Sequence, residues 1–253
     1  MLVDYHTHPL GHMDRKISKE NIREFLEVAV KKGVSEVGFT DHNRYYEEFD
    51  FDLIAEVAKE YPQLKVRRGI EMDYTPGKED EIAEFLGQFD LDYVIGSIHF
   101  LGDWMFDHPD YTAEYDNWKI VELYKEYFDY IRGAAESGLF QILGHLDLIK
   151  VFGYRPKEDI VEIVTPTLEV IAAEDIVIEI NTNGMNKPAQ EFYPSREILE
   201  KAYELGIKVT MSSDAHKAER IGENLSAVKD ILVDIGYTEI ATFENKKRKM
   251  VKL

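Results

Sequence analysis

The sequence has no cysteine, which excludes disulfide bonds and thiolate metal ligands. Any metal site must therefore use nitrogen and oxygen ligands, which come from histidine and carboxylate side chains. No apolar run approaches the roughly 20 residues of a membrane-spanning helix. Nothing that resembles a signal peptide precedes the first expected strand. These absences predict a cytoplasmic protein that has no membrane partner.

Positive charge is also scarce, since the sequence has 30 Lys and Arg residues against 49 Asp and Glu residues, and the formal net charge is −19. Such an excess of negative charge opposes binding to nucleic-acid backbones and anionic membranes. We therefore expect no nucleic acid as main partner, unless metal ions supply local positive charge. The basic run at 246–249 indicates a solvated C-terminal end.

A glycine-rich phosphate loop is missing after the first strand, which argues against a nucleotide-binding doubly wound fold. Apolar strand patterns alternate with helical ones along the chain, and this alternation predicts parallel strands with helical crossovers. The pattern favours an α/β fold with a seven-stranded barrel, and an open doubly wound sheet is the alternative. No linker-like segment interrupts the chain, so we expect one domain over residues 1–253.

The expected helices include 18–33, one that begins at Pro156 and one over 224–235, and the expected strands include 36–40 and 65–70. A long irregular stretch is expected from Phe100 to about Asp116. Its aromatic residues argue against a disordered linker. A weakly patterned tail follows the last helix.

Each expected strand ends in residues that can bind metal or substrate. In chain order they are His6 and His8, His42, Glu71, His99, His145, Asn181, then Asp214 and His216. The carboxyl ends of barrel strands meet at one face, so these side chains should meet there. Crowded imidazoles and carboxylates are costly unless a cation pairs them. Six or more such residues exceed the needs of one tetrahedral ion, which predicts two to three divalent transition-metal ions, Zn, Mn or Fe.

Six segments carry a family resemblance. They are Asp4–His8, Thr40–His42, Gly69–Glu71, Gly96–His99, Gly144–Asp147 and Ser212–His216. With these segments the chain resembles the PHP (polymerase and histidinol phosphatase) family. The histidinol-phosphatase branch is suggested by Ser97–Phe100 with Phe106-Asp107, and by Asn181-Thr182 with Tyr193–Ser195.

The resemblance implies a distorted, TIM-like (β/α)7 barrel of PHP type with a trinuclear metal site. The implied ligands of the first metal are His6, His8, Glu71 and Asp214, and Glu71 would bridge to a second metal held by His99 and His145. A third metal would be held by His42, His216 and one further residue. Relatives place this residue about six positions beyond His8, which is Asp14 here, but His12 lies nearer the strand end and is our preferred ligand.

The implied reaction is metal-dependent hydrolysis of a phosphate monoester, with L-histidinol phosphate of histidine biosynthesis as the small-molecule substrate. Asp214, His216 and Glu71 are the predicted catalytic residues, and the proton donor to the leaving group stays open between Asp214, His216 and water. The predicted substrate-binding residues are His42, Arg15, Trp104, Arg155, Lys187 and Arg196. The aromatic ring of Trp104 could instead only anchor its loop. Two alternatives stay open: a phosphoesterase acting on nucleotides or oligonucleotides, and a non-catalytic metal-binding barrel.

Overall fold

The structure is a computed structural model that describes residues 1–253. The chain groups into two compact units. Unit 1 comprises 1–72, 90–95 and 210–253, and unit 2 comprises 73–89 and 96–209. Three of their boundaries fall within strands β4 (Glu71–Asp73), β5 (Ile95–Ser97) and β10 (Val209–Ser212), and a fourth falls between Phe89 and Asp90. The expected single domain over residues 1–253 stays a prediction.

Unit 1 contains a parallel sheet in the order β1 (Val3–Asp4), β2 (Glu36–Phe39) and β3 (Lys65–Arg68). On the other side of β1, the Tyr5 amide donates a hydrogen bond to the Met211 carbonyl over 3.2 Å, which places the end of β10 there. All four residues of β2 are buried. Burial on both faces is typical of parallel sheets covered by helices.

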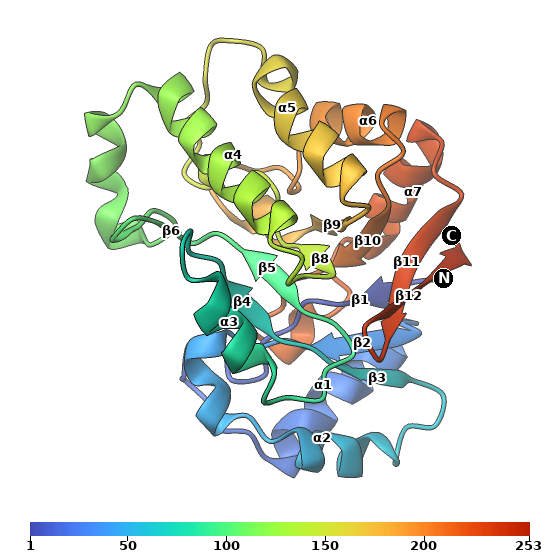
Figure 1. The fold of residues 1–253 in the computed structure, drawn as a ribbon. Helices are drawn as coiled ribbons and strands as arrows, with labels where there is room; N and C mark the ends of the chain where they lie inside the picture. Colours follow the sequence, from blue (N-terminus) through green and yellow to red (C-terminus); the bar gives the residue numbers. More distant parts are fainter. The chain divides into compact units, whose positions relative to one another are not determined.

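Helices α1 (Lys19–Lys31), α2 (Phe51–Ala58) and α7 (Leu225–Ile235) also belong to unit 1, and α1 and α2 pack side by side (Figure 1). The side chain of Ser18 caps α1 by accepting a hydrogen bond from the Asn21 amide. Gly33 follows the helix with a φ of +72°, a conformation in which glycine carries no steric cost. The helix expected over 18–33 is therefore confirmed.

Unit 2 contains the parallel strands β8 (Ile142–Leu143) and β9 (Val177–Asn181). Its helices are α3 (Glu79–Leu86), α4 (Ile120–Glu136), α5 (Ile160–Ala173) and α6 (Arg196–Glu204). Helix α4 packs against α5 and α5 against α6, as the green, yellow and orange helices of Figure 1 show. The parallel α/β class is confirmed, while closure into a barrel of seven strands stays a prediction.

Two expected element boundaries and one expected irregular stretch are wrong. The helix expected from Pro156 begins at Ile160, because the Asp159 carboxylate accepts a hydrogen bond from the Val161 amide (2.8 Å) and caps it there. The stretch from Phe100 is not irregular: it contains the hairpin of β6 (Phe100–Leu101) and β7 (Trp104–Met105), followed by a 3-10 helix over Pro109–Asn117. The strand expected over 65–70 ends at Arg68.

The expected weakly patterned tail is also wrong, since it forms the antiparallel hairpin of β11 (Glu239–Glu244) and β12 (Lys247–Lys252). Asn245 and Lys246 make its two-residue turn with φ values of 50° and 59°, as hairpin turns of this length require. The amide of Phe243 donates to the hydroxyl of Tyr5 over 3.1 Å, which holds the hairpin at the start of unit 1. The basic run thus lies mainly on an ordered strand.

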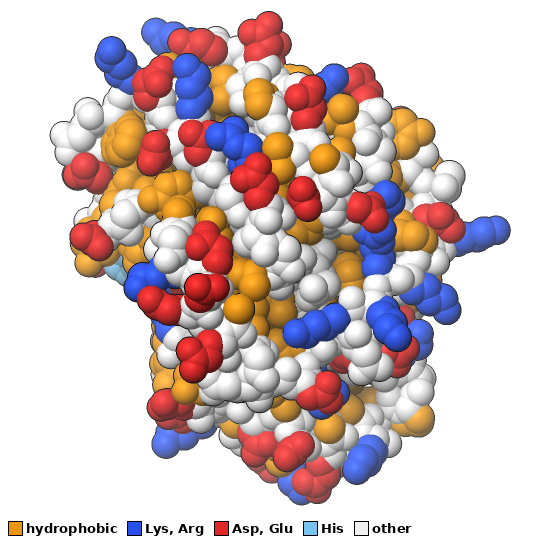
Figure 2. Space-filling model, viewed as in Figure 1, with side chains coloured by type: hydrophobic (Ala, Val, Ile, Leu, Met, Phe, Trp, Pro, Cys, Tyr) orange, Lys and Arg blue, Asp and Glu red, His pale blue; other side chains and the backbone are white.

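The surface agrees with the charge composition. On the face drawn in Figure 2, acidic, basic and hydrophobic side chains are interspersed. None of the helices combines the length and the hydrophobicity that would let it cross a membrane.

Candidate metal centre

The ligand-type residues of unit 1 follow its strands directly. His6 and His8 come just after β1 and are fully buried, and their i, i+2 spacing in extended chain turns both rings to one side. His42 comes three residues after β2, and it pairs with Glu71 in a parallel β-bridge. The amide of His8 also donates to the Ala215 carbonyl over 2.9 Å, next to Asp214 and His216. Backbone pairing therefore brings these strand ends together.

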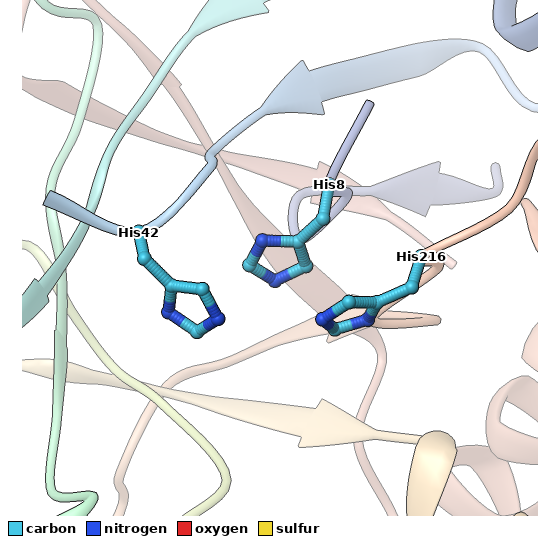
Figure 3. Close-up of side chains that lie close together, drawn as sticks. All are labelled: His8, His42 and His216. Carbon is cyan, nitrogen blue, oxygen red and sulfur yellow. The ribbon is translucent and has the colours of Figure 1, made fainter. Parts of the chain in front are cut away.

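Three imidazoles form the first ligand group. One ring nitrogen from each of His8, His42 and His216 lies within 4.8 Å of the others. Figure 3 shows the three rings turned toward a common region from three different segments. The rings of His8 and His216 stack with their centroids 4.1 Å apart, and those of His8 and His42 are 4.6 Å apart. Three convergent nitrogens are a suitable donor set for a transition-metal ion.

The carboxylate of Glu71 contacts three imidazoles. Its Oε1 lies 3.3 Å from His6 Nε2, and its Oε2 lies 2.7 Å from His42 Nδ1 and 3.6 Å from His8 Nε2. The side chain is buried. A carboxylate that contacts several imidazoles through its two oxygens could serve as a metal ligand beside them. That Glu71 bridges to a second metal held by His99 and His145 stays a prediction.

Asp214 completes this group. Its Oδ1 lies 3.2 Å from His8 Nε2 and 3.4 Å from His216 Nδ1. Burial alone would raise the pKa of Asp214, but the neighbouring imidazoles of His6, His8 and His216 hold that pKa well below its usual value. Asp214 is therefore ionised at neutral pH. Burial and the neighbouring His8 lower the pKa of His216, which leaves its imidazole in the neutral form that binds metals.

Two aspartates that the sequence did not single out support the cluster. Asp41 lies 3.7 Å from His8 Nδ1, on the opposite side of the ring from Asp214, and accepts hydrogen bonds from the Leu10 amide. Asp4 accepts hydrogen bonds from the amide and hydroxyl of Ser213 (2.8 and 2.6 Å), beside Asp214. Carboxylates that orient ligating residues in this way tune metal affinity. Both aspartates lie inside the segments that carry the family resemblance, and this position is the sequence signal that could have identified them.

The chemistry of this donor set fits metal ions. Its members are nitrogen and carboxylate oxygen donors, almost all buried, and the buried Nε2 atom of His216 makes no hydrogen bond within the protein. Burying so many ionisable groups is costly without a cation to pair them. Nitrogen and oxygen donors suit Zn, Mn and Fe.

His12 lies beside the three-imidazole group. Its ring centroid is 4.4 Å from that of His216 and 6.0 Å from that of His42. Asp14 instead has a side chain that is 62% exposed, 3.9 Å from the guanidinium of Arg15. This placement supports His12 over Asp14, although its role as a ligand stays a prediction.

Mutation can distinguish His12 from Asp14 as the further metal ligand. We expect His12→Ala to lower the metal content of the purified protein by about one ion per chain, whereas Asp14→Ala should leave it unchanged, because imidazole is a strong ligand and already lies next to the cluster. Elemental analysis measures both. Loss of the ion from Asp14→Ala together with its retention in His12→Ala would reverse the assignment.

His99 and His145 belong to unit 2. Both are buried, and their ring centroids lie 5.0 Å apart. Asp73 Oδ1 lies 2.5 Å from His99 Nδ1, which orients the ring as a carboxylate partner of a ligating histidine does. The sequence analysis missed Asp73, yet its i, i+2 spacing from Glu71 on β4 was a usable signal. Asn181 donates to Glu179 Oε1 over 3.0 Å, so it belongs to a buried polar network.

Three predicted substrate-binding residues already have partners in the protein. Arg15 donates to the backbone carbonyls of Pro9, His8 and His216, and so braces segments that carry metal-ligand candidates. Trp104 Nε1 donates to the Tyr111 carbonyl (3.2 Å) and its ring packs edge-on against Tyr115 at 4.9 Å, as the loop-anchoring alternative expects. Arg196 pairs with Glu200 on α6. Their contact with substrate stays a prediction.

Comparisons with known proteins agree with this geometry. The PHP domain family model matches residues 4–183. A probable histidinol-phosphatase of Deinococcus radiodurans is 38% identical, and the alignment covers 97% of this chain and 98% of that protein. A histidinol-phosphatase of Bacillus subtilis is 30% identical over 81% of this chain and 90% of its own length.

A solved structure shows the same fold. The crystal structure of histidinol phosphate phosphatase from Lactococcus lactis, complexed with zinc, L-histidinol and phosphate, superposes with a TM-score of 0.82 at 23% identity. The match covers 98% of both chains. With the family model covering most of its length and a relative 38% identical over nearly the whole chain, the chain belongs to the PHP domain family.

Proposed function

We propose that this protein is a metal-dependent histidinol-phosphatase, which hydrolyses L-histidinol phosphate to L-histidinol and phosphate in histidine biosynthesis. The observation that carries the proposal is the buried cluster of histidines and carboxylates at the strand ends. The relatives from Deinococcus radiodurans and Bacillus subtilis are named as a probable histidinol-phosphatase and a histidinol-phosphatase, which supports this substrate. The ligand candidates are His6, His8, His12, His42, Glu71, His99, His145, Asp214 and His216.

The metal ions, when bound, supply Lewis-acid chemistry, since they withdraw charge from phosphate oxygens and make water acidic enough to react at neutral pH. Asp214, whose carboxylate lies within the cluster 3.2 Å from His8 Nε2, is our candidate to accept the proton of the water that attacks phosphorus. The P–O bond to the leaving group then breaks, and the proton held on Asp214 can pass to the leaving alkoxide oxygen. His216, beside Asp214, is the second candidate for this transfer.

The phosphate also needs cationic partners from the chain, and two predicted ones lie on neighbouring loops of unit 2. The Ala189 amide donates to the Val151 carbonyl over 3.0 Å, and Arg155 Nη2 donates to the Ala189 carbonyl over 3.2 Å. These bonds join the loop of Arg155 to the loop of Lys187. Arginine offers a planar fork of donors that matches phosphate oxygens, and lysine offers a point charge.

We expect Arg155→Ala and Lys187→Ala each to lower kcat/KM for histidinol phosphate about ten- to a hundred-fold, mainly by raising KM, because each change removes a charge-assisted hydrogen bond of about 1.5–3 kcal/mol. Metal content should not change. Arg132→Ala is the matched control, since Arg132 pairs with Asp129 on the surface of α4. Wild-type kinetics in both variants would remove these two residues from the substrate site.

A substrate panel tests the function itself. The metal-loaded protein is assayed for phosphate release from histidinol phosphate, nucleoside monophosphates and short oligonucleotides. We expect histidinol phosphate to have the highest kcat/KM. Higher values with nucleotide esters would favour the nucleotide phosphoesterase alternative, and no release from any ester would favour a non-catalytic metal-binding barrel.

The proposal extends to location and partners. A cysteine-free, strongly acidic chain supports a cytoplasmic enzyme whose main partner is a small phosphate ester and not a nucleic acid. The metal ions explain how such a chain binds an anion, because their charge dominates the local field while more distant surface charges are screened beyond about 8–10 Å.

A further inference from the structure

A buried lysine in unit 2 has no part in the proposed chemistry so far. The side chain of Lys150 is 2% exposed. Its Nζ lies 2.7 Å from Asp147 Oδ2, 2.9 Å from Glu191 Oε2 and 2.8 Å from the Phe192 carbonyl. An ammonium group has three N–H donors, and here each has an acceptor. Lys150 is therefore fully engaged and cannot bind a ligand itself.

The Glu191 carboxylate connects this lysine to Arg155. The same Oε2 atom that contacts Lys150 lies 2.9 Å from Arg155 Nη2. Although burial would raise the pKa of Glu191, Lys150 and Arg155 hold it below its usual value, so the group stays a carboxylate. Arg155 Nη2 also donates to the Ala189 carbonyl. Both donors of this nitrogen are used, which fixes the plane of the guanidinium.

The other edge of the same guanidinium is available. Arg155 Nε and Nη1 make no hydrogen bond within the protein, and the side chain is 43% exposed. These two nitrogens carry three N–H donors, which is enough for bidentate hydrogen bonding to a phosphate. A guanidinium held at one corner and open along the other edge is preorganised, because the rotamer entropy of a long side chain is lost before the ligand arrives.

We propose that Lys150 and Glu191 are positioning residues that hold Arg155 ready to bind the phosphate group of the substrate. The inference rests on the proposed function only through the role of Arg155. Lys150 fixes Glu191 from inside the unit, and Glu191 fixes Arg155 at its edge. Neither residue needs to touch the substrate.

Binding of inorganic phosphate to the metal-loaded protein, measured by titration calorimetry, tests the proposal without turnover. We expect Glu191→Ala and Arg155→Ala each to raise the Kd of phosphate about ten-fold, which is a typical effect for one charge-assisted hydrogen bond. The double variant should be no weaker than Arg155→Ala alone, because both changes act through one guanidinium. Glu191→Gln should give an intermediate Kd. Glu204→Ala, which removes an exposed partner of Lys201, is the control.

Kinetics and metal content separate positioning from a general structural role. Glu191→Ala should raise KM for histidinol phosphate about ten-fold, with kcat within a factor of two and the metal content unchanged. A lower metal content, or a lower kcat at unchanged KM, would mean that Glu191 has a structural role and would overturn the proposal. Unchanged phosphate affinity in Glu191→Ala would overturn it as well. So would a double variant whose loss of phosphate affinity equals the product of the two single losses. The protein could also bind phosphate with the expected pattern but fail to hydrolyse histidinol phosphate. That result would support the positioning role of Lys150 and Glu191 and contradict only the proposed substrate.

Discussion

Glu71→Gln should lower kcat/KM by roughly a thousand-fold and reduce the metal content of the purified protein. The carboxylate contacts His6, His8 and His42 through its two oxygens, and we expect it to be a ligand shared by two ions. Glutamine keeps the shape but removes the negative charge, and an amide offers only one weak oxygen ligand. Loss of an outer-shell partner already costs about 10- to 100-fold, and a bridging ligand should cost more.

Steady-state kinetics and elemental analysis on the same preparation measure this effect. Glu24→Gln serves as the control, because Glu24 is an exposed residue of α1 and the substitution makes the same chemical change outside the cluster. A Glu71→Gln variant with full metal content and near wild-type turnover would refute the bridging role.

Exhaustive chelation should abolish turnover and lower the Tm by about 8–16 °C. A ligand present at a thousand times its Kd stabilises the folded state by about 4 kcal/mol. A domain of this size shifts by about 2–4 °C for each kcal/mol. Removing the ions also leaves buried imidazoles and carboxylates without their cationic partners, which adds to the loss.

Thermal melts before and after chelation measure the shift, and elemental analysis of untreated protein should find two to three ions per chain. Adding zinc back should restore both the Tm and the activity, which controls for irreversible damage by the chelator. A melting curve that chelation does not change would mean that the ions are peripheral, and one ion or none in untreated protein would contradict a multinuclear centre.

Secondary-structure elements that depend on residues close together in the sequence were predictable. Helix α1 follows from the Ser18 cap, an apolar stripe at helical spacing and Gly33, all within about four turns of chain. The strand ends were also predictable, since a short apolar run followed by a ligand-type residue recurs along the chain. Parallel topology then predicts that these ends meet, because parallel strands run in the same direction and present their carboxyl ends at one edge.

Elements that depend on distant partners were not predictable. The hairpin of β11 and β12 has little periodicity of its own, and its buried side depends on Tyr5, 238 residues earlier in the chain. The loop after β5 reads as irregular because its order comes from packing among aromatic rings, such as Trp104 on Tyr115. Pro156 and the Asp159 cap are competing start signals for α5, and the helix begins after the cap.

The same division applies to the site. The sequence alone determined the ligand types, their places at strand ends and therefore the class of chemistry, because these follow from residue identity and local periodicity. Only the tertiary structure decided which groups touch: Glu71 against three imidazoles, Arg15 on backbone carbonyls, and Glu191 between Lys150 and Arg155. Contacts in the site join residues up to 209 positions apart. Side-chain direction over such separations depends on the packing of the whole chain, which no local pattern records.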